Sequence, residues 1–369
     1  MDFQPNEEQR MFAESARKFL SREFPLQRVR DIESQGLSAF LPCYREMAKL
    51  GYLALGIPEQ AGGSGTWLDL ELFAEEAGRA LVPPLQIASI AIGAQALAAF
   101  GRADTVAALL AGESVLAPAW LEQDEASREP PRSTQCGRRG DAFVIEGEKR
   151  HVLGFEVAGE LLVAARGDDG PCFALVPADA PGISSRRAVL TSGDTVSDLR
   201  FGSVKVERER LLRGSWSDWL RIMDGAKIIA AAWAVGAARA AIDMALGYAK
   251  DRKQFGVPIG KFQAVQHRLA EAAITLEQAC AMVRYAAWLH ATRTDCAREA
   301  AMAKIVAGKA VRQVTHAATL THGGYGFMEE FDIQLYFRRA TLFEHLVEGP
   351  ATQREILAAD AGEDLLRVF

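Results

Sequence analysis

The chain has 369 residues and 49% of them are hydrophobic, which is enough for more than one buried core and predicts two or three domains. The formal net charge is −6, and no basic stripe or patch of interleaved basic and aromatic residues is present. This composition argues against nucleic acid as a partner and favours small molecules or other proteins.

The cysteines and the N-terminal residues indicate the compartment. Cys43, Cys136, Cys172, Cys280 and Cys296 are scattered and odd in number, without zinc spacing, so we expect free thiols and neither a disulfide framework nor a metal site. The first ten residues are polar, and the longest apolar runs, at 87–100 and 228–238, are too short to span a membrane. We therefore expect a cytoplasmic protein with no membrane segment.

Residues 1–113 are expected to form a helical N-terminal domain. Phe12, Ala16 and Phe19 repeat at helical spacing, and residues 68–81 form a second amphipathic run.

The hydrophobic period shortens in residues 114–215, which predicts a middle antiparallel β domain. Short β-rich runs lie at 143–145, 161–164, 173–176 and 196–206, and Gly-Asp and Pro-Gly pairs separate them. The polar segment 122–135 contains Pro130 and Pro131, so we expect a surface loop that enters this domain.

Residues 216–369 return to helical spacing and predict a C-terminal helical bundle. The apolar residues of one long helix alternate spacings of three and four: Phe262, Val265, Leu269, Ala272, Leu276, Ala279 and Val283. The order of helices, strands and helices predicts an α+β fold in three domains.

Residues 248–267 carry the most informative stretch, YAKDRKQFGVPIGKFQAVQH. Arg252 can form paired, charge-assisted bonds to phosphate oxygens, and Phe255 offers an apolar face to a flat ligand. With Gln254, they favour part of a dinucleotide site at a helix-to-helix elbow. The spacing alone is equally compatible with an ordinary polar turn.

This stretch resembles the signature of the acyl-CoA dehydrogenase family of flavoproteins. Residues 322–330, HGGYGFMEE, resemble the Gly-Gly-x-Gly segment of the same family, and residues 57–65, IPEQAGGSG, resemble its N-terminal turn. The resemblance spans nearly the whole chain. It implies a β domain between two helical domains, and FAD-dependent removal of two hydrogens from the α and β carbons of an acyl-CoA thioester.

The resemblance also implies a cofactor site shared between subunits. The family's elbow and glycine segment reach across a dimer interface to the diphosphate and adenosine half of a neighbour's FAD, and the matching positions here are Arg252, Gln254, Phe255, Gly323, Gly324 and Gly326. The glycines also suit the end of a helix, and exposed backbone N–H groups at such an end can form an anion pocket. Leu320 stands where the family has a polar residue, which weakens the expected pocket.

The family's catalytic base is not found in register. It is most often a Glu that follows an Arg-Asp-Ala segment, and the corresponding run here begins at Phe337-Arg338-Arg339-Ala340. An ungapped count places Val347 at the base position and Glu348 one residue later, where helical geometry turns the side chain by about 100°. Glu348 is thus either a base after local rearrangement or a solvated residue beside a Gly-Pro turn. The base position of other relatives, on an earlier helix, holds Ala226, and Asp224 lies two residues away.

The flavin-ring wall that the resemblance implies is altered as well. The family's Trp-x-Thr matches His151, Val152 and Leu153, and Leu153 has no hydrogen-bonding group. His151 is either a packed or surface residue or an acid-base group. These departures predict that the chain's own flavin-ring site is lost.

Three functions remain open. In the first, the chain is a subunit of a heterotetramer and completes the FAD site of a related partner chain. Such heteromers occur among relatives that act on steroid side chains. Alternatively, it is a self-sufficient homotetrameric acyl-CoA dehydrogenase that uses Glu348, or a flavin-free scaffold or binding protein of the same fold. The resemblance implies an acyl-CoA substrate from lipid or steroid catabolism and an electron-transfer flavoprotein as the electron acceptor.

Overall fold

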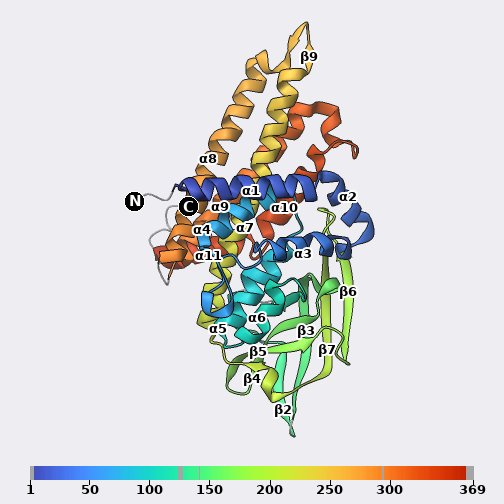
Figure 1. The fold of residues 1–369 in the computed structure, drawn as a ribbon, viewed down its shortest axis with the longest axis vertical. Coiled ribbons are helices and arrows are strands. Elements are labelled where there is room, and N and C mark those ends of the chain that lie inside the picture. The colour runs from blue at the N-terminus through green and yellow to red at the C-terminus, as the bar shows by residue number, and fades with distance from the viewer. Residues whose placement is uncertain (1–3, 124–127, 141, 293–294, 363–369) are drawn as a thin grey trace.

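The computed structural model describes residues 4–123, 128–140, 142–292 and 295–362. A helical region, a sheet and a second helical region follow one another along the chain (Figure 1). This order confirms the predicted α+β fold, whereas the domain limits at 113/114 and 215/216 stay a prediction.

The N-terminal helices surround an apolar core. They are α1 (Glu7–Glu23), α2 (Leu26–Gln35), α3 (Leu41–Lys49), α4 (Trp67–Arg79), a π-helix (Ile87–Ala94), α5 (Gln95–Ala99) and α6 (Ala103–Leu110). Capping boxes begin α1 at Asn6 and α4 at Thr66, where each cap side chain accepts a backbone N–H and the third helical residue bonds back. Every residue of the π-helix is buried, and such local rewinding is frequent at functional sites.

The central sheet is mainly antiparallel. Its strands are β1 (Leu116–Ala119), β2 (Gln135–Arg139), β3 (Ala142–Leu153), β4 (Glu160–Gly167), β5 (Gly170–Pro177), β6 (Ile183–Val189), β7 (Thr195–Val206) and β8 (Leu211–Leu212). The order is β6-β7-β3-β2-β4-β5-β8. Strand β1 lies outside this order and pairs with β4. The pairs β1/β4 and β2/β4 are parallel, so the sheet is not antiparallel throughout. Alternate residues of these strands form a second apolar core.

The segment predicted as a surface loop is anchored from within. Glu122 is buried, and its carboxylate accepts the backbone N–H groups of Arg132, Ser133 and Thr134 at 2.8–3.1 Å. The fully buried Lys149 ammonium lies 2.6 Å from the same carboxylate. Most described residues of the segment are exposed, as predicted for a surface loop, but Glu122 is buried and its carboxylate ties the segment to β3. Residues 124–127 of the segment lie outside the described residues.

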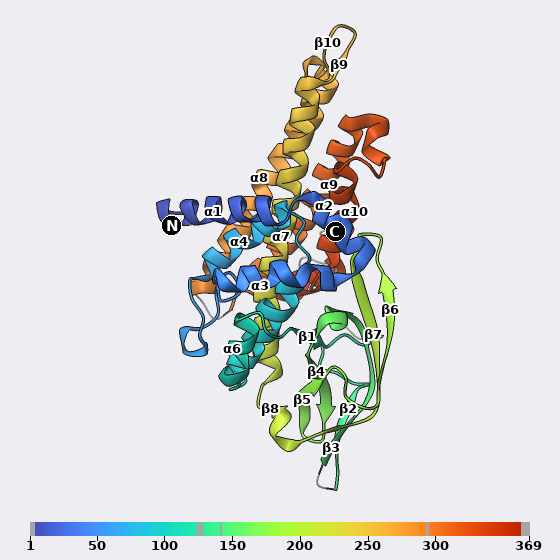
Figure 2. The ribbon, with the colours of Figure 1, turned by 45° about the vertical axis from the view of Figure 1, so that its right-hand side comes forward.

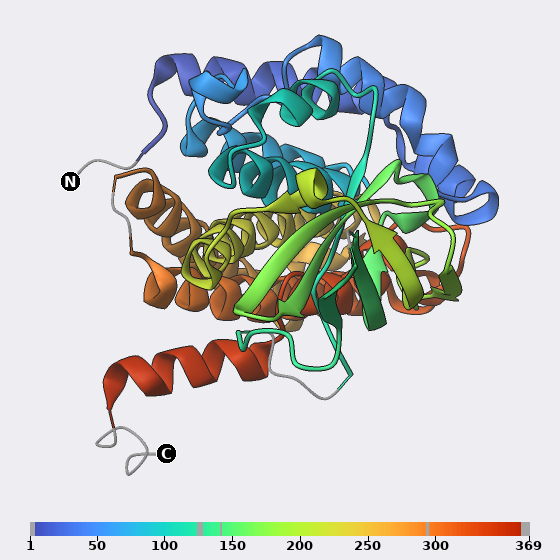
Figure 3. The ribbon, with the colours of Figure 1, turned by 90° about the horizontal axis from the view of Figure 1, so that it is seen from below.

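The C-terminal region is built around one long helix. Its helices are α7 (Trp216–Asp251), α8 (Gln263–Thr292), α9 (Ala297–His322), α10 (Ile333–His345) and α11 (Pro350–Ala361). The far ends of α7, α8 and α9 project from the body of the molecule as an arm (Figures 1 and 2). Seen from the sheet side, α11 lies along the outer flank of the helices (Figure 3).

Helix α7 is buried along most of its length. Among the described residues it is the one helix long and apolar enough to cross a membrane, but 83% of its apolar window is covered by the rest of the protein. Helix α4 crosses it at very close range: a Cβ added at Gly236 would lie 1.7 Å from the Glu75 carbonyl oxygen, and one at Gly78 would lie 2.0 Å from that of Trp233. Glycine at both positions is therefore what permits the crossing.

A buried carboxyl group at this crossing generates a pH-dependent prediction. Burial, and then the neighbouring Glu75 carboxylate, raise the pKa of Glu71 from 4.5 to about 8, against the pull of Arg284 and Arg239. A carboxyl whose pKa is raised on folding binds its proton more tightly in the folded state, so stability is lost as pH rises from about 4.5 to about 8.

We expect Glu71→Gln, which keeps the shape of the protonated acid, to flatten this slope. At pH 8.5 the variant should exceed the parent protein in unfolding free energy by at least about 1.4 kcal/mol, the value of one pKa unit. Urea unfolding at pH 5.5, 7 and 8.5 measures both slopes. Equal slopes in the two proteins would show that Glu71 is ionised on both sides of the transition.

Candidate functional site

The elbow predicted from residues 248–267 is a tight hairpin between α7 and α8. Two short strands, β9 (Lys253–Gln254) and β10 (Val257–Pro258), pair antiparallel, and Phe255 and Gly256 form the turn with φ of 52° and 80°. Two successive left-handed residues are typical of a tight hairpin turn. The turn places the Phe255 ring in solvent, where the residue is 92% exposed.

The hairpin and the glycine segment line one cavity of about 490 Å³. Its lining includes Arg252, Gln254, Gly323 and Gly324, and a Cβ added at either glycine would meet open space. The Arg252 guanidinium carbon lies 6.0 Å from the centre of the Tyr325 ring. The cavity thus combines a cation, an amide and bare backbone, a set suited to a phosphate group.

Two of the residues predicted for this site lie outside the cavity lining. Phe255 stands at the tip of the hairpin, and Gly326 is buried at a point where a Cβ would lie 2.4 Å from the Thr319 carbonyl oxygen. Gly326 therefore shapes the turn behind the cavity. Tyr248 and His322, which were not among the predicted site residues, also line the cavity, and their ring centroids lie 4.4 Å apart.

A second pocket, of about 380 Å³, lies where the three parts of the chain meet. The β region contributes Trp120, Leu121, His151 and Leu153, and the π-helix contributes Ile87, Ala88 and Ile92. The end of α10 and the turn to α11 supply residues 345–349 and Leu342. We call this space the apolar pocket, because its walls are mainly aliphatic.

Few polar groups face the apolar pocket. His151 is exposed at its rim with φ of 52°, and its backbone N–H donates to Asp198 Oδ1 at 3.1 Å. Trp120 Nε1 and Glu348 Oε1 are buried and have no hydrogen-bond partner among the described residues. The lining also includes the polar side chains of His345 and Thr352, whereas Leu121 and Leu153 offer no hydrogen-bonding side chain.

The turn from α10 to α11 brings both Val347 and Glu348 to this pocket. Val347 has φ of 71°, a left-handed conformation that is strained for a β-branched residue. The turn is thereby rewound, and Glu348 lies in the pocket wall with a fully buried side chain. The interpretation of Glu348 as a solvated residue is wrong; its role as a base stays a prediction. Ala226 is fully buried in α7 and is not among the residues that line the pocket.

Glu348 belongs to a buried ionic cluster. Its Oε2 lies 3.0 Å from Lys227 Nζ, which in turn lies 2.6 Å from Asp224 Oδ1. Arg128 adds a second cation at 2.8 Å from Asp224 Oδ1. The sequence analysis noted Asp224 only as a neighbour of Ala226. Two charges three residues apart, at Asp224 and Lys227, in an otherwise apolar helical run were the available signal.

A basic cleft of about 690 Å³ lies on the other side of the same turn, between α9, α10 and α11. Cationic side chains in its lining include Lys309, Arg312, Arg338 and Arg354. Lys304 donates to the carbonyl oxygens of Phe343 at 2.7 Å and Glu344 at 2.8 Å, and so holds the last turn of α10. Burial lowers the pKa of Lys304 from 10.5 to about 7.

The comparisons with known proteins agree with one another. Residues 216–361 match the model of the acyl-CoA dehydrogenase C-terminal domain, and residues 6–112 match that of the N-terminal domain. The chain is 30% identical to the probable acyl-CoA dehydrogenase YngJ of Bacillus subtilis, over 97% of this chain and 99% of that protein. It is 32% identical to the benzylmalonyl-CoA dehydrogenase of Aromatoleum aromaticum, over 92% and 93%. The solved steroid ACAD Tcur3481-Tcur3483 superposes with a TM-score of 0.86 at 29% identity, over 98% and 99%.

The buried ionic cluster yields a stability prediction. Lys227→Met removes the cation that faces Glu348 and leaves that carboxylate buried without a charged partner, at an expected cost of about 3–5 kcal/mol in unfolding free energy.

Combining Lys227→Met with Glu348→Gln should recover part of this cost, and a double-mutant cycle by urea unfolding measures the coupling. A loss below about 1 kcal/mol for Lys227→Met, or strict additivity of the two changes, would show that the pair is not coupled.

Proposed function

The chain belongs to the acyl-CoA dehydrogenase family, and from that premise we propose that it completes the FAD site of a related partner chain. Members of the family are oxidoreductases that act on CH–CH donors, with FAD as cofactor. The proposed reaction is the α,β-dehydrogenation of an acyl-CoA thioester. One observation carries the proposal: the elbow cavity combines Arg252, Gln254 and bare glycine backbone, whereas the apolar pocket presents mainly aliphatic side chains, including Leu121 and Leu153, to a flavin ring.

The distance between these two places supports a site shared between chains. Lys227 lies beside the apolar pocket and Arg252 at the elbow, on either end of one continuous stretch of α7 and its cap. Their 25-residue separation corresponds to about 37 Å along a helix of 1.5 Å rise per residue. The elbow also projects away from the body (Figure 2). Arg252 therefore serves a cofactor bound mainly by another chain.

The elbow residues fit the diphosphate half of FAD. The Arg252 guanidinium supplies charge-assisted donors, Gln254 adds an amide, and Gly323 and Gly324 expose backbone without side-chain obstruction. The exposed Phe255 ring offers a face against which an adenine or the partner chain can pack.

The apolar pocket fits a flavin ring poorly. A flavin has a polar edge of nitrogens and carbonyl oxygens, and Leu121 and Leu153 present only methyl groups to the space. In the proposed complex, FAD held by the partner would supply the hydride acceptor, and the partner would carry the base and the ring site. This chain supplies the grip on the diphosphate.

A heterotetramer with such a partner is the assembly we propose, with an electron-transfer flavoprotein as acceptor and a cytoplasmic location. The similarity to the steroid ACAD Tcur3481-Tcur3483, which carries two chain names, supports lipid or steroid catabolism as its setting. Large apolar side chains exposed on the arm also support the assembly, because a partner chain would cover them. Those at the elbow and glycine segment are Phe255, Leu320, Tyr325, Phe327 and Met328.

Arg252→Ala tests the proposal directly. Loss of the guanidinium should weaken FAD binding to the complex by about tenfold or more, because a charge-assisted bond to phosphate is lost. The measurement is the FAD dissociation constant, by flavin fluorescence, of this chain co-purified with its related partner. Lys250→Ala removes a nearby exposed charge that does not line the cavity and serves as control. Equal affinities for the two variants would contradict the proposal.

A self-sufficient homo-oligomer is the second candidate, and Glu348 favours it. Glu348 is among the residues that line the apolar pocket, and its buried Oε1 has no hydrogen-bond partner among the described residues, as expected for a base that is not paired in the resting protein. If this candidate holds, Glu348→Gln abolishes acyl-CoA turnover by the chain alone and leaves flavin bound, because an amide cannot accept the α proton. Glu344→Gln, which alters a carboxylate of the preceding helical turn paired with Arg312, should keep turnover. Unchanged turnover in Glu348→Gln would exclude this candidate.

A further inference from the structure

His322, the last residue of α9, lines the elbow cavity beside the glycine segment. The residue is only 8% exposed, and its ring stacks on the ring of Tyr248. The stacking restricts the plane in which the imidazole lies. Because the rest of the residue is buried, the part of His322 that a ligand can reach belongs to the cavity wall.

The two ring nitrogens of His322 have different surroundings. Nδ1 lies 2.8 Å from the Ala318 carbonyl oxygen, and a carbonyl oxygen only accepts, so Nδ1 carries the proton. In the neutral ring, Nε2 is then a hydrogen-bond acceptor. Nε2 bonds to no described residue and is not one of the fully buried side-chain atoms that lack a partner, so it is accessible. The wall of the elbow cavity therefore contains an acceptor that no donor of the described chain satisfies.

This acceptor lies about one helical turn from Arg252. Tyr248 and Arg252 are four residues apart at the end of α7, so their side chains leave the same face of the helix. The Arg252 N–H closes this turn on the Tyr248 carbonyl oxygen at 2.9 Å. One turn corresponds to roughly 5 Å along the helix axis. His322, stacked on Tyr248, can thus contact the group that follows a phosphate held by Arg252.

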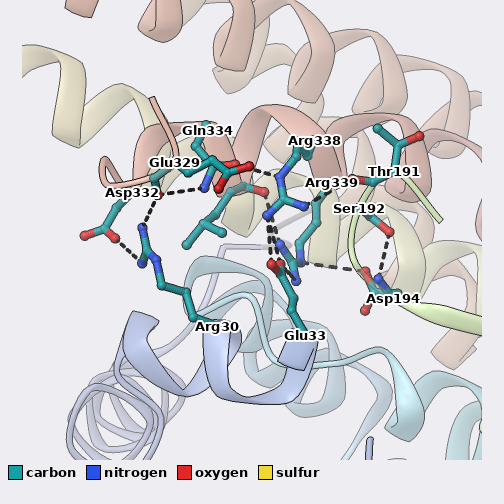
Figure 4. A network of polar contacts seen from close by, with 11 residues as sticks. Arg30, Glu33, Thr191, Ser192, Asp194, Glu329, Asp332, Gln334, Arg338 and Arg339 are labelled. Carbon is teal, nitrogen blue, oxygen red and sulfur yellow. Dashed lines mark hydrogen bonds and ion pairs between the residues drawn. The ribbon is translucent and has the colours of Figure 1, made fainter. Parts of the chain in front are cut away.

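Contacts with the N-terminal region fix the chain that follows the glycine segment. Arg30 of α2 donates to the Glu329 carbonyl oxygen at 3.1 Å and pairs with Asp332 at 2.6 Å (Figure 4). Further along α2, Glu33 accepts a bond from Arg339 of α10 at 2.8 Å. Helix α9 and these contacts hold both ends of residues 323–328. The cavity wall is therefore formed before a ligand arrives, which lowers the entropic cost of binding.

The group next to the diphosphate of a dinucleotide that can satisfy this acceptor is a sugar. Its hydroxyl groups donate hydrogen bonds, whereas phosphate oxygens accept them and offer nothing to an unprotonated nitrogen. The exposed Phe255 ring of the same elbow suits an adenine. The adenosine ribose therefore fits this position better than the ribityl chain at the other end of the diphosphate.

We propose that His322 is a specificity-determining residue of the elbow cavity, whose Nε2 accepts a hydrogen bond from a hydroxyl group of the adenosine ribose. The inference rests on the proposed function, because it needs Arg252 to hold the diphosphate. It adds the sugar that the cavity selects: a ribonucleotide binds more tightly than its deoxy form.

Competition between ADP and FAD tests the inference in the complex of this chain with its related partner, after FAD has been removed. At pH 8, ADP should compete about fivefold better than the weaker of 2′-deoxy-ADP and 3′-deoxy-ADP, because one hydrogen bond is lost. In His322→Phe, which keeps an aromatic ring to stack on Tyr248, all three nucleotides should compete equally. The measurement is the inhibition constant of each nucleotide against FAD rebinding, followed by flavin fluorescence.

His267→Phe is the matched control, because His267 is exposed on α8 and does not line the elbow cavity. This variant should keep the preference for ADP. Deoxy forms that match ADP in the parent complex would overturn the inference even if His322→Phe does not fold, and so would a preference that survives in His322→Phe.

The same assay separates this inference from the proposed function. Arg252→Ala should weaken competition by all three nucleotides and leave their ratio unchanged. If ADP does not compete, or competes equally well in the Arg252→Ala complex, the proposed function is contradicted and the inference with it. If ADP competes through Arg252 but no deoxy form is weaker, only the role of His322 is contradicted.

Discussion

The burial of α7 through the centre of the molecule is the constraint on which the other features depend. Alanine and glycine fill its middle, so α4 crosses it at backbone contact, with Gly78 and Gly236 at the crossing. Helix α7 therefore sets the separation between Lys227, beside the apolar pocket, and Arg252, at the elbow.

The buried charges follow from the same packing. Lys227 and Asp224 lie on a helix face that other elements cover, so their charges must be balanced inside the protein by Glu348 and Arg128. Lys304 donates to the final carbonyl groups of α10, which would otherwise be buried without hydrogen-bond donors. Together these groups set the turn that separates the apolar pocket from the basic cleft. The strain at Val347 is located in that turn.

Much of this could be predicted from the sequence where the pattern is local and repeated. The seam Leu269, Ala272, Leu276 is buried as the spacing predicted, and the β-rich runs all lie in strands. Arg252 and Gln254 were predicted to join Gly323 and Gly324, and one cavity contains all four. The cavity's use for FAD remains a proposal.

The remaining features could not be predicted because they depend on tertiary contacts. The left-handed Val347 decides where Glu348 lies, and no local pattern predicts such a conformation for a β-branched residue. In the sequence, Glu122 is one residue of a polar segment, and its ion pair with Lys149 of the distant strand β3 appears only in the structure. Glu33 and Arg339 are separated by 306 residues, so their contact has no signature in a single sequence.

The amount of FAD bound per chain tests the central claim most directly. The chain purified alone should be colourless, and the complex with its related partner should carry one FAD for each partner chain and be reduced by an acyl-CoA. If the chain alone is yellow, binds one FAD per chain and is bleached by an acyl-CoA, its own ring site is complete and the account of a donated half-site is contradicted.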